Sequence, residues 1–143
     1  MSAETPGALV LATRLSRVAY RRATEDLLGM RLKQFSALAY LRQAPGVSQR
    51  QLGDAMLLDA NNCVLLLNDI EDAGWAQRRR DPDDRRRHVV EITDAGREAL
   101  EHAEEALDDL EDEVLEGLTS QERKTLRELL AKALADIPVQ VSA

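Results

Sequence analysis

Residues 74–92 read GWAQRRRDPDDRRRHVVEI, and no other segment constrains the architecture as strongly. Apolar and polar residues alternate in Trp75–Arg79 and again in His88–Ile92, which is typical of β-strands with one buried face. Between them, residues 81–84 read DPDD and have the composition of a turn. The sequence therefore predicts a β-hairpin with a highly charged tip, called the wing below.

Two short helices are predicted directly before the wing. Ser48 and Gln51 have the spacing of a capping box and open a helix over 49–56. After a tight turn, Asp59 is a candidate N-cap for a helix over 60–73. Two short helices joined by a tight turn indicate a helix-turn-helix.

Longer helices are predicted on both sides of this unit. Apolar residues recur at threes and fours over 8–28 and over 32–43. Thr93 is a candidate cap for a helix over 94–117. A second capping box, Thr119 with Glu122, opens a last helix that Pro138 ends.

Composition bounds the class of protein. A chain of 143 residues with 44% hydrophobic residues is expected to form one domain, residues 1–143, around one core. Its single cysteine, Cys63, excludes a disulfide framework and a cysteine-rich zinc site. Because we see neither a signal-peptide layout nor a long apolar run, we expect a cytoplasmic protein.

Charge is distributed unevenly along the chain. The net charge is −7, yet residues 1–90 carry 14 basic against 11 acidic residues, whereas residues 91–143 carry 5 against 15. Six arginines fall within the ten positions 78–87. A locally basic segment in a protein that is acidic overall can still bind phosphate.

The long helix and the terminal helices carry apolar stripes that a winged helix of about 65 residues cannot cover. Pairing of two chains through residues 8–28 and 98–137 would cover them, including Leu107, Leu110, Leu126 and Leu130. We therefore expect a homodimer, whose two-fold symmetry suits a palindromic DNA site.

Three segments of the sequence resemble the MarR (multiple-antibiotic-resistance regulator) family: residues 74–78, 80–86 and 90–96. The resemblance implies a mainly α fold with a minor β part. Its DNA-binding part is a winged helix-turn-helix over 32–97 with a two-stranded wing, flanked by N- and C-terminal dimerisation helices. It also implies a DNA-binding transcription regulator, expected to be a repressor, that a small aromatic or phenolic effector releases from DNA.

The resemblance assigns roles in the wing. Arg86 would reach the minor groove, and Asp84 would orient neighbouring basic groups. The other basic residues there are expected to contact phosphate or the groove, since guanidinium suits both. They are Arg78, Arg79, Arg85 and Arg87.

The recognition helix is expected to read bases in the major groove. Its candidate contacts are Asn61, Asn62, Val64, Leu65 and Asn68. Asparagine can pair bidentately with adenine, and apolar side chains can touch the thymine methyl group. The alternative is that Val64 and Leu65 belong partly to the core and only the asparagines touch DNA. Phosphate contacts are expected from the start of the preceding helix, at Ser48, Gln49 and Arg50.

Effector, cofactor and enzyme hypotheses have weaker support. Cationic and aromatic walls of an effector site could come from Arg14, Arg17, Tyr20, Phe35 and Tyr40. We expect no cofactor and no metal, and Cys63 is interpreted as a buried structural residue, with a redox sensor as the alternative. Because no catalytic motif is found, we expect no enzyme; a winged helix that binds only proteins is the other alternative.

Overall fold

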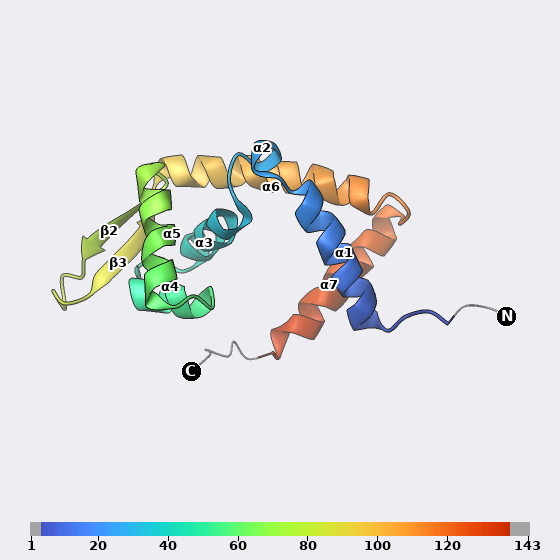
Figure 1. The fold of residues 1–143 in the computed structure, drawn as a ribbon, viewed down its shortest axis with the longest axis horizontal. Helices are drawn as coiled ribbons and strands as arrows, with labels where there is room; N and C mark the ends of the chain where they lie inside the picture. Colours follow the sequence, from blue (N-terminus) through green and yellow to red (C-terminus); the bar gives the residue numbers. More distant parts are fainter. Residues whose placement is uncertain (1–3, 138–143) are drawn as a thin grey trace.

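The computed structural model describes residues 4–137, which form an arch with the winged helix in one leg and the two terminal helices in the other (Figure 1). The elements in chain order are α1 Ala8–Arg22, α2 Glu25–Leu28, α3 Leu32–Gln43, β1 Val47–Ser48, α4 Gln49–Ala55, α5 Ala60–Asp72, β2 Ala76–Arg80, β3 His88–Ile92, α6 Asp94–Val114 and α7 Ser120–Ala135. The mainly α fold with a winged helix-turn-helix is confirmed. Helix α6 spans the top of the arch and joins the two legs.

The predicted helix caps are confirmed. The Ser48 hydroxyl accepts the N–H of Gln51 at 3.0 Å, and the Gln51 side chain accepts the N–H of Ser48 at 2.9 Å. The Asp59 carboxylate accepts the N–H of Asn62 at 2.8 Å, which starts α5. Thr119 and Glu122 make the second capping box at the start of α7. Each cap satisfies N–H groups that the helix itself leaves unpaired.

The single first helix expected over 8–28 is wrong, because the chain breaks after Arg22 and resumes as α2. Thr24 caps α2 by accepting the N–H of Leu27, and Gly29 ends it with a φ of 78°. This break turns the chain into the core, where Leu28 and Met30 are each 1% exposed.

The predicted hairpin is confirmed, but the sheet has three strands rather than two. Strand order is β1-β3-β2, with both pairings antiparallel. Val90 of β3 faces Val47 on one side and Arg78 on the other, and it is fully buried. The short β1 strand anchors the wing to the start of α4.

The junction between the wing and α6 is tightly packed. The Thr93 hydroxyl donates to the Gly74 carbonyl at 2.6 Å and accepts the N–H of Gly96 at 3.0 Å. A Cβ atom on Gly96 would lie 2.8 Å from the carbonyl carbon of Trp75 and would overlap its oxygen. Position 96 therefore requires glycine, and α6 is attached rigidly to the base of the wing.

The core lies in the winged-helix leg and under α6. It contains Leu38, Leu52, Leu67, Val90 and Leu100, each fully buried. The guanidinium of Arg42 on α3 forms a bidentate ion pair with Glu104 on α6, which joins the two helices at their surface.

The other leg contributes little to this core, since neither α1 nor α7 has a buried residue. The expectation that Leu110 needs a partner chain for cover is wrong, because it is 5% exposed within this one chain. Helix α6 ends at Val114 and α7 at Ala135, both slightly earlier than expected. Pro138 lies outside the described residues. Within residues 4–137, no helix combines the length and apolarity needed to span a bilayer.

Candidate nucleic-acid interface

One face of α5 is open to solvent beside the wing (Figure 1). Asn61, Leu65 and Asn68 fall on this face at helical spacing, and all three are exposed. Leu65 is 55% exposed, so its assignment to the core is wrong, whereas Val64 is half-buried as that alternative supposed. The opposite face of α5 packs Cys63, Leu66, Leu67 and Ile70 into the core.

The tip of the wing, residues 81–87, is held by hydrogen bonds that its own aspartates accept from backbone N–H groups. Asp81 accepts the backbone N–H of Asp83 at 2.9 Å, and Asp84 accepts that of Arg86 at 3.0 Å. Asp84 was expected to orient basic side chains, but the group that its carboxylate binds is a backbone N–H. It therefore shapes the turn that carries Arg86 rather than holding a guanidinium.

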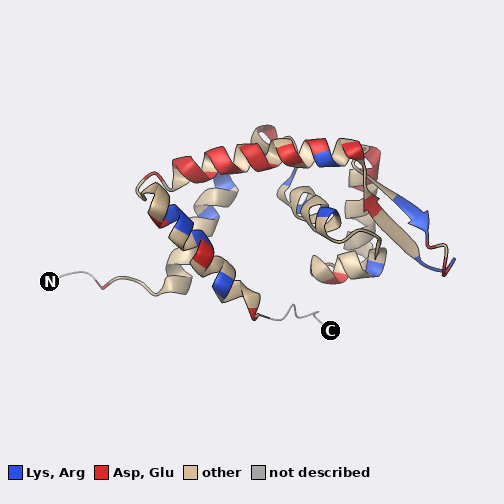
Figure 2. Cartoon of the chain, turned by 180° about the vertical axis from the view of Figure 1, so that it is seen from behind, with Lys and Arg blue, Asp and Glu red and all other residues tan. Residues whose placement is uncertain are grey.

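The wing arginines fall into two groups. Arg80, Arg85, Arg86 and Arg87 are exposed and form no ion pair within residues 4–137, and Arg80 donates to the Arg85 carbonyl at 3.4 Å. Arg79 pairs with Glu91 on the neighbouring strand at 2.6 Å, and Arg78 pairs with Glu71 on α5. The charge available to an anionic partner is therefore concentrated at the tip (Figure 2).

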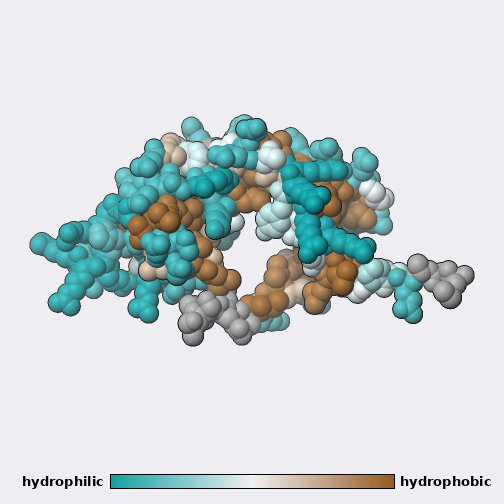
Figure 3. All heavy atoms as spheres, viewed as in Figure 1, coloured by the Kyte–Doolittle hydropathy of each residue, from teal (hydrophilic) through white to brown (hydrophobic). Residues whose placement is uncertain are grey.

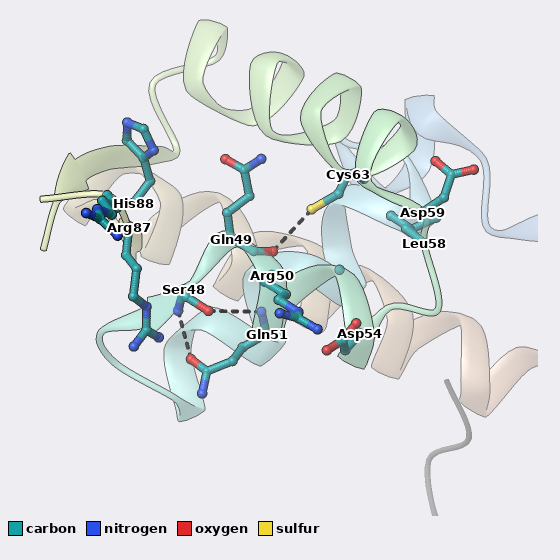
Figure 4. A pocket seen from close by; sticks show the side chains of 13 residues that line it. Ser48, Gln49, Arg50, Gln51, Asp54, Leu58, Asp59, Cys63, Arg87 and His88 are labelled. Carbon is teal, nitrogen blue, oxygen red and sulfur yellow. Dashed lines mark hydrogen bonds between the residues drawn. The ribbon is translucent and has the colours of Figure 1, made fainter. Parts of the chain in front are cut away.

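A groove of about 1030 Å³ runs between the start of α4, the start of α5 and the end of the wing tip. Figure 4 shows Arg50, Arg87 and His88 among its lining side chains. Ser48 is 6% exposed and its hydroxyl caps α4, so of the three residues expected to contact phosphate here, only the half-buried Gln49 and the exposed Arg50 present side chains to a partner. Asp54 and Asp59 also line the groove, so only its basic edge, at Arg50, Arg86 and Arg87, is chemically suited to a phosphodiester backbone.

Cys63 lines this groove from α5, and its sulfur faces the Gln49 carbonyl at the start of α4 (Figure 4). It is 2% exposed, as expected, and its thiol donates to the Gln49 carbonyl at 3.5 Å. Burial raises the pKa of the thiol, and the nearby Arg78 opposes this only in part. The reactive thiolate is therefore disfavoured.

The residues proposed for an effector site are not gathered in one place. Tyr20, 64% exposed, lies on α1 with Arg14 and Arg17, whereas Phe35 and Tyr40 pack half-buried against the core from α3. These helices stand in different legs of the arch (Figure 1). Within residues 4–137, no group of three His, Cys, Asp or Glu side chains could hold a metal ion.

Sequence reasoning missed the polar links that hold this interface together. Arg31, the N-cap residue of α3, forms an ion pair with Asp69 on the exposed side of α5. Glu71 was assigned no role, although its Oε1 atom is buried and faces Arg78. Helix α5 carries acidic residues but no basic one, so nothing in its own sequence indicates which arginine each acid would meet.

Comparison with known proteins agrees with this geometry. A family model described as "MarR family" matches residues 28–87. The HTH-type transcriptional regulator YdgJ of Bacillus subtilis (strain 168) is 30% identical over 108 residues, which are 76% of this chain and 66% of that protein, slightly under two thirds of its length. The HTH-type transcriptional regulator BilQ of Clostridium symbiosum (strain WAL-14163) is 30% identical over 104 residues, 73% of this chain and 72% of that protein.

Solved structures show the same fold. Wild-type MarR from E. coli in its apo form superposes with a TM-score of 0.78 at 27% identity, covering 92% of this chain and 99% of that one. A cysteine-to-serine mutant of the same protein, complexed with operator DNA, superposes with a TM-score of 0.70 at 28% identity, covering 87% and 91% of the two chains.

Proposed function

Since this chain belongs to the MarR family of DNA-binding transcription regulators, we propose that it is a cytoplasmic repressor that binds a palindromic operator as a homodimer. The observation that carries the proposal is the exposed face of α5 beside a wing tip with three arginines that form no ion pair in residues 4–137. An α-helix fits the major groove, and arginine suits the negative potential of a narrow minor groove. This pairing of elements matches the two grooves of one duplex.

The distribution of charge supports an end-on approach to DNA. The outer face of α6 is acidic along most of its length (Figure 2), and this face repels phosphate. The arginines of the wing tip and Arg50 lie at the other end of the winged-helix leg. The duplex is therefore expected to meet only the wing and the helix-turn-helix.

Exposed apolar side chains support the homodimer. Figure 3 shows apolar surface on the leg that α1 and α7 form. The large exposed apolar residues of these two helices are Leu9, Val10, Leu11, Val18, Tyr20, Leu129, Leu130 and Leu134. An apolar groove of about 380 Å³ between α1, α6 and α7 adds to this surface. A contiguous apolar surface of this kind fits a second copy of the chain better than water.

Release by a small aromatic or phenolic effector is the part of the proposal that depends on the family alone. The five candidate residues line none of four cavities found among residues 4–137. Redox control through Cys63 has less support, because the thiol is buried and its pKa is raised. A protein-binding winged helix would leave the exposed amides of α5 without a role.

Selection of random duplexes by the purified protein, followed by sequencing, tests the DNA-binding part. We expect an inverted repeat that binds two chains, and a reporter gene behind that sequence should be silenced. Enrichment of no sequence would refute the proposal and favour the protein-binding alternative.

Analytical ultracentrifugation tests the dimer. Leu134→Asp places a charge on the exposed apolar leg, where Leu134 is 64% exposed, and should shift the dimer toward monomer. Leu57→Asp is the matched control, since Leu57 is similarly exposed at 60% but lies in the turn between α4 and α5. A folded wild-type monomer at micromolar concentration would contradict the dimer.

A further inference from the structure

Arg78 on β2 connects its own strand to α4 and α5, the two helices of the helix-turn-helix. Its Nη2 atom donates to the Asn68 side-chain oxygen on α5 at 2.8 Å, and its Nη1 atom donates to Gln49 on α4 at 3.5 Å. Its Nε atom pairs with Glu71, also on α5, whose Oε1 atom is buried. Two N–H groups of this guanidinium thus donate hydrogen bonds to other side chains, and its Nε atom faces a carboxylate oxygen that accepts no hydrogen bond from the residues described.

This contact fixes which way the Asn68 amide points. A guanidinium only donates hydrogen bonds, so the Asn68 atom that faces Arg78 must be the carbonyl oxygen, Oδ1. The amide group is planar, and its NH2 end is then turned away from β2. Asn68 is exposed on the open face of α5, so the group it offers to a partner is a pair of donors.

The Asn62 amide is oriented the other way, with its nitrogen bound inside the protein. An ionised carboxylate only accepts, so the Asn62 atom that lies 3.1 Å from the Asp59 carboxylate must be the amide nitrogen. Asp59 is itself held by the N–H of Asn62 at the start of α5. Asn62 therefore keeps its oxygen free to accept, and the two asparagines differ in hydrogen-bonding character.

We propose that Arg78 determines base specificity by setting Asn68 as a donor. The inference rests on the proposed function, in which this face of α5 lies in the major groove. Bidentate pairing with adenine requires one amide oxygen and one amide nitrogen to face the same base. With its oxygen turned to Arg78, Asn68 instead matches acceptor atoms: N7 and O6 of guanine, or O4 of thymine. Arg78 acts here as a positioning residue and not as a DNA contact.

Duplex selection with three proteins tests this assignment. Asn68→Ala identifies the base pair that Asn68 reads, because preference should disappear there and persist elsewhere. At that position the wild-type protein should prefer guanine or thymine to adenine. Arg78→Met frees the amide and should move the preference at the same position toward adenine, by on the order of tenfold relative to wild type.

Arg79→Met is the matched control. Arg79 is the next residue on β2 and also forms an ion pair, but with Glu91 on β3 rather than with α5. The Arg79→Met substitution removes the same charge as Arg78→Met and should lower the affinity for all duplexes alike. Circular dichroism and thermal unfolding check that each variant is folded. Even if Arg78→Met does not fold, the wild-type and Asn68→Ala data decide whether Asn68 acts as a hydrogen-bond donor toward the base.

The outcomes separate the inference from the function on which it rests. Wild-type preference for adenine at the Asn68 position, or an Arg78→Met protein that loses affinity evenly as Arg79→Met does, would overturn the inference and leave operator binding intact. Failure of the wild-type protein to enrich any sequence would overturn the proposed function as well.

Discussion

The backbone N–H of Arg86 donates to the Asp84 carboxylate at 3.0 Å, so an acidic residue forms the turn that carries an arginine of the wing tip. The Asp84 carbonyl also accepts the N–H of Arg87 at 3.0 Å. A negative charge near phosphate is unfavourable by itself, so in the proposed complex we expect the hydrogen bond to the turn to outweigh the repulsion.

Asp84→Ala should weaken DNA binding by roughly three- to tenfold, the size of one lost hydrogen bond, although it removes a negative charge. Asp83→Ala is the control, because the Asp83 side chain accepts no hydrogen bond within residues 4–137, and its loss should leave affinity unchanged or slightly raised. Fluorescence anisotropy with one operator duplex measures both. Tighter binding by Asp84→Ala would contradict the role assigned to the turn.

The arginines of the wing should differ in how their loss depends on sequence and salt. Arg86→Ala should cost about 1–3 kcal/mol on a duplex that is A·T-rich beneath the wing and less on a G·C-rich one, since groove width sets the potential it meets. Arg87→Ala should weaken binding equally on both duplexes. It should also make the slope of log affinity against log salt concentration shallower by roughly one unit. Arg79→Ala should lower the slope less, because Glu91 already compensates its charge. Titrations at several salt concentrations distinguish the three, and equal slopes would contradict the grouping.

Gly96→Ala should destabilise the protein by about 3 kcal/mol, the upper range for overpacking, because the new Cβ would overlap the Trp75 carbonyl group. Gly117→Ala is the control, since a Cβ there meets nothing within 4 Å. It should be neutral or stabilise by about 0.4–1 kcal/mol. Urea unfolding at neutral pH measures both variants, and similar midpoints would refute the packing at the wing–α6 junction.

The Arg42–Glu104 ion pair should make stability depend on pH. The hydrogen bond from Arg42 holds the pKa of the Glu104 carboxyl below its ordinary value, and burial opposes this only in part. A lowered folded-state pKa stabilises above the unfolded value, about 4.3, and this contribution disappears as pH falls through the folded value. The stability difference between wild type and Glu104→Gln should therefore be full at pH 7 and shrink below about pH 4.

Glu105→Gln is the control for this pH dependence, since Glu105 is exposed and forms no ion pair within residues 4–137. It should show no comparable change between the two pH values. A Glu104→Gln difference that stays constant as the pH falls would mean that the ion pair does not stabilise the α3–α6 contact.

Local signals were sufficient for most of the secondary structure. The caps at Ser48, Asp59 and Thr119 act within three residues, so neighbouring residues alone determine where α4, α5 and α7 begin. The wing followed from alternation and its turn, and the family from three short segments around it. The break at Thr24 was missed although it carries a local cap, because the apolar spacing of α1 continues across it.

Only the tertiary structure decided which polar groups meet. Strand β1 exists because Val47 pairs with Val90, which is distant in the chain, and two residues carry no periodicity that could reveal a strand. The sequence contains many arginines and acids, and nothing local selects Glu71 and Asn68 for Arg78, or Glu104 for Arg42. Composition and periodicity therefore determined the elements and their order. The orientation of the Asn68 amide depends on a contact between β2 and α5, which forms only when the chain has folded.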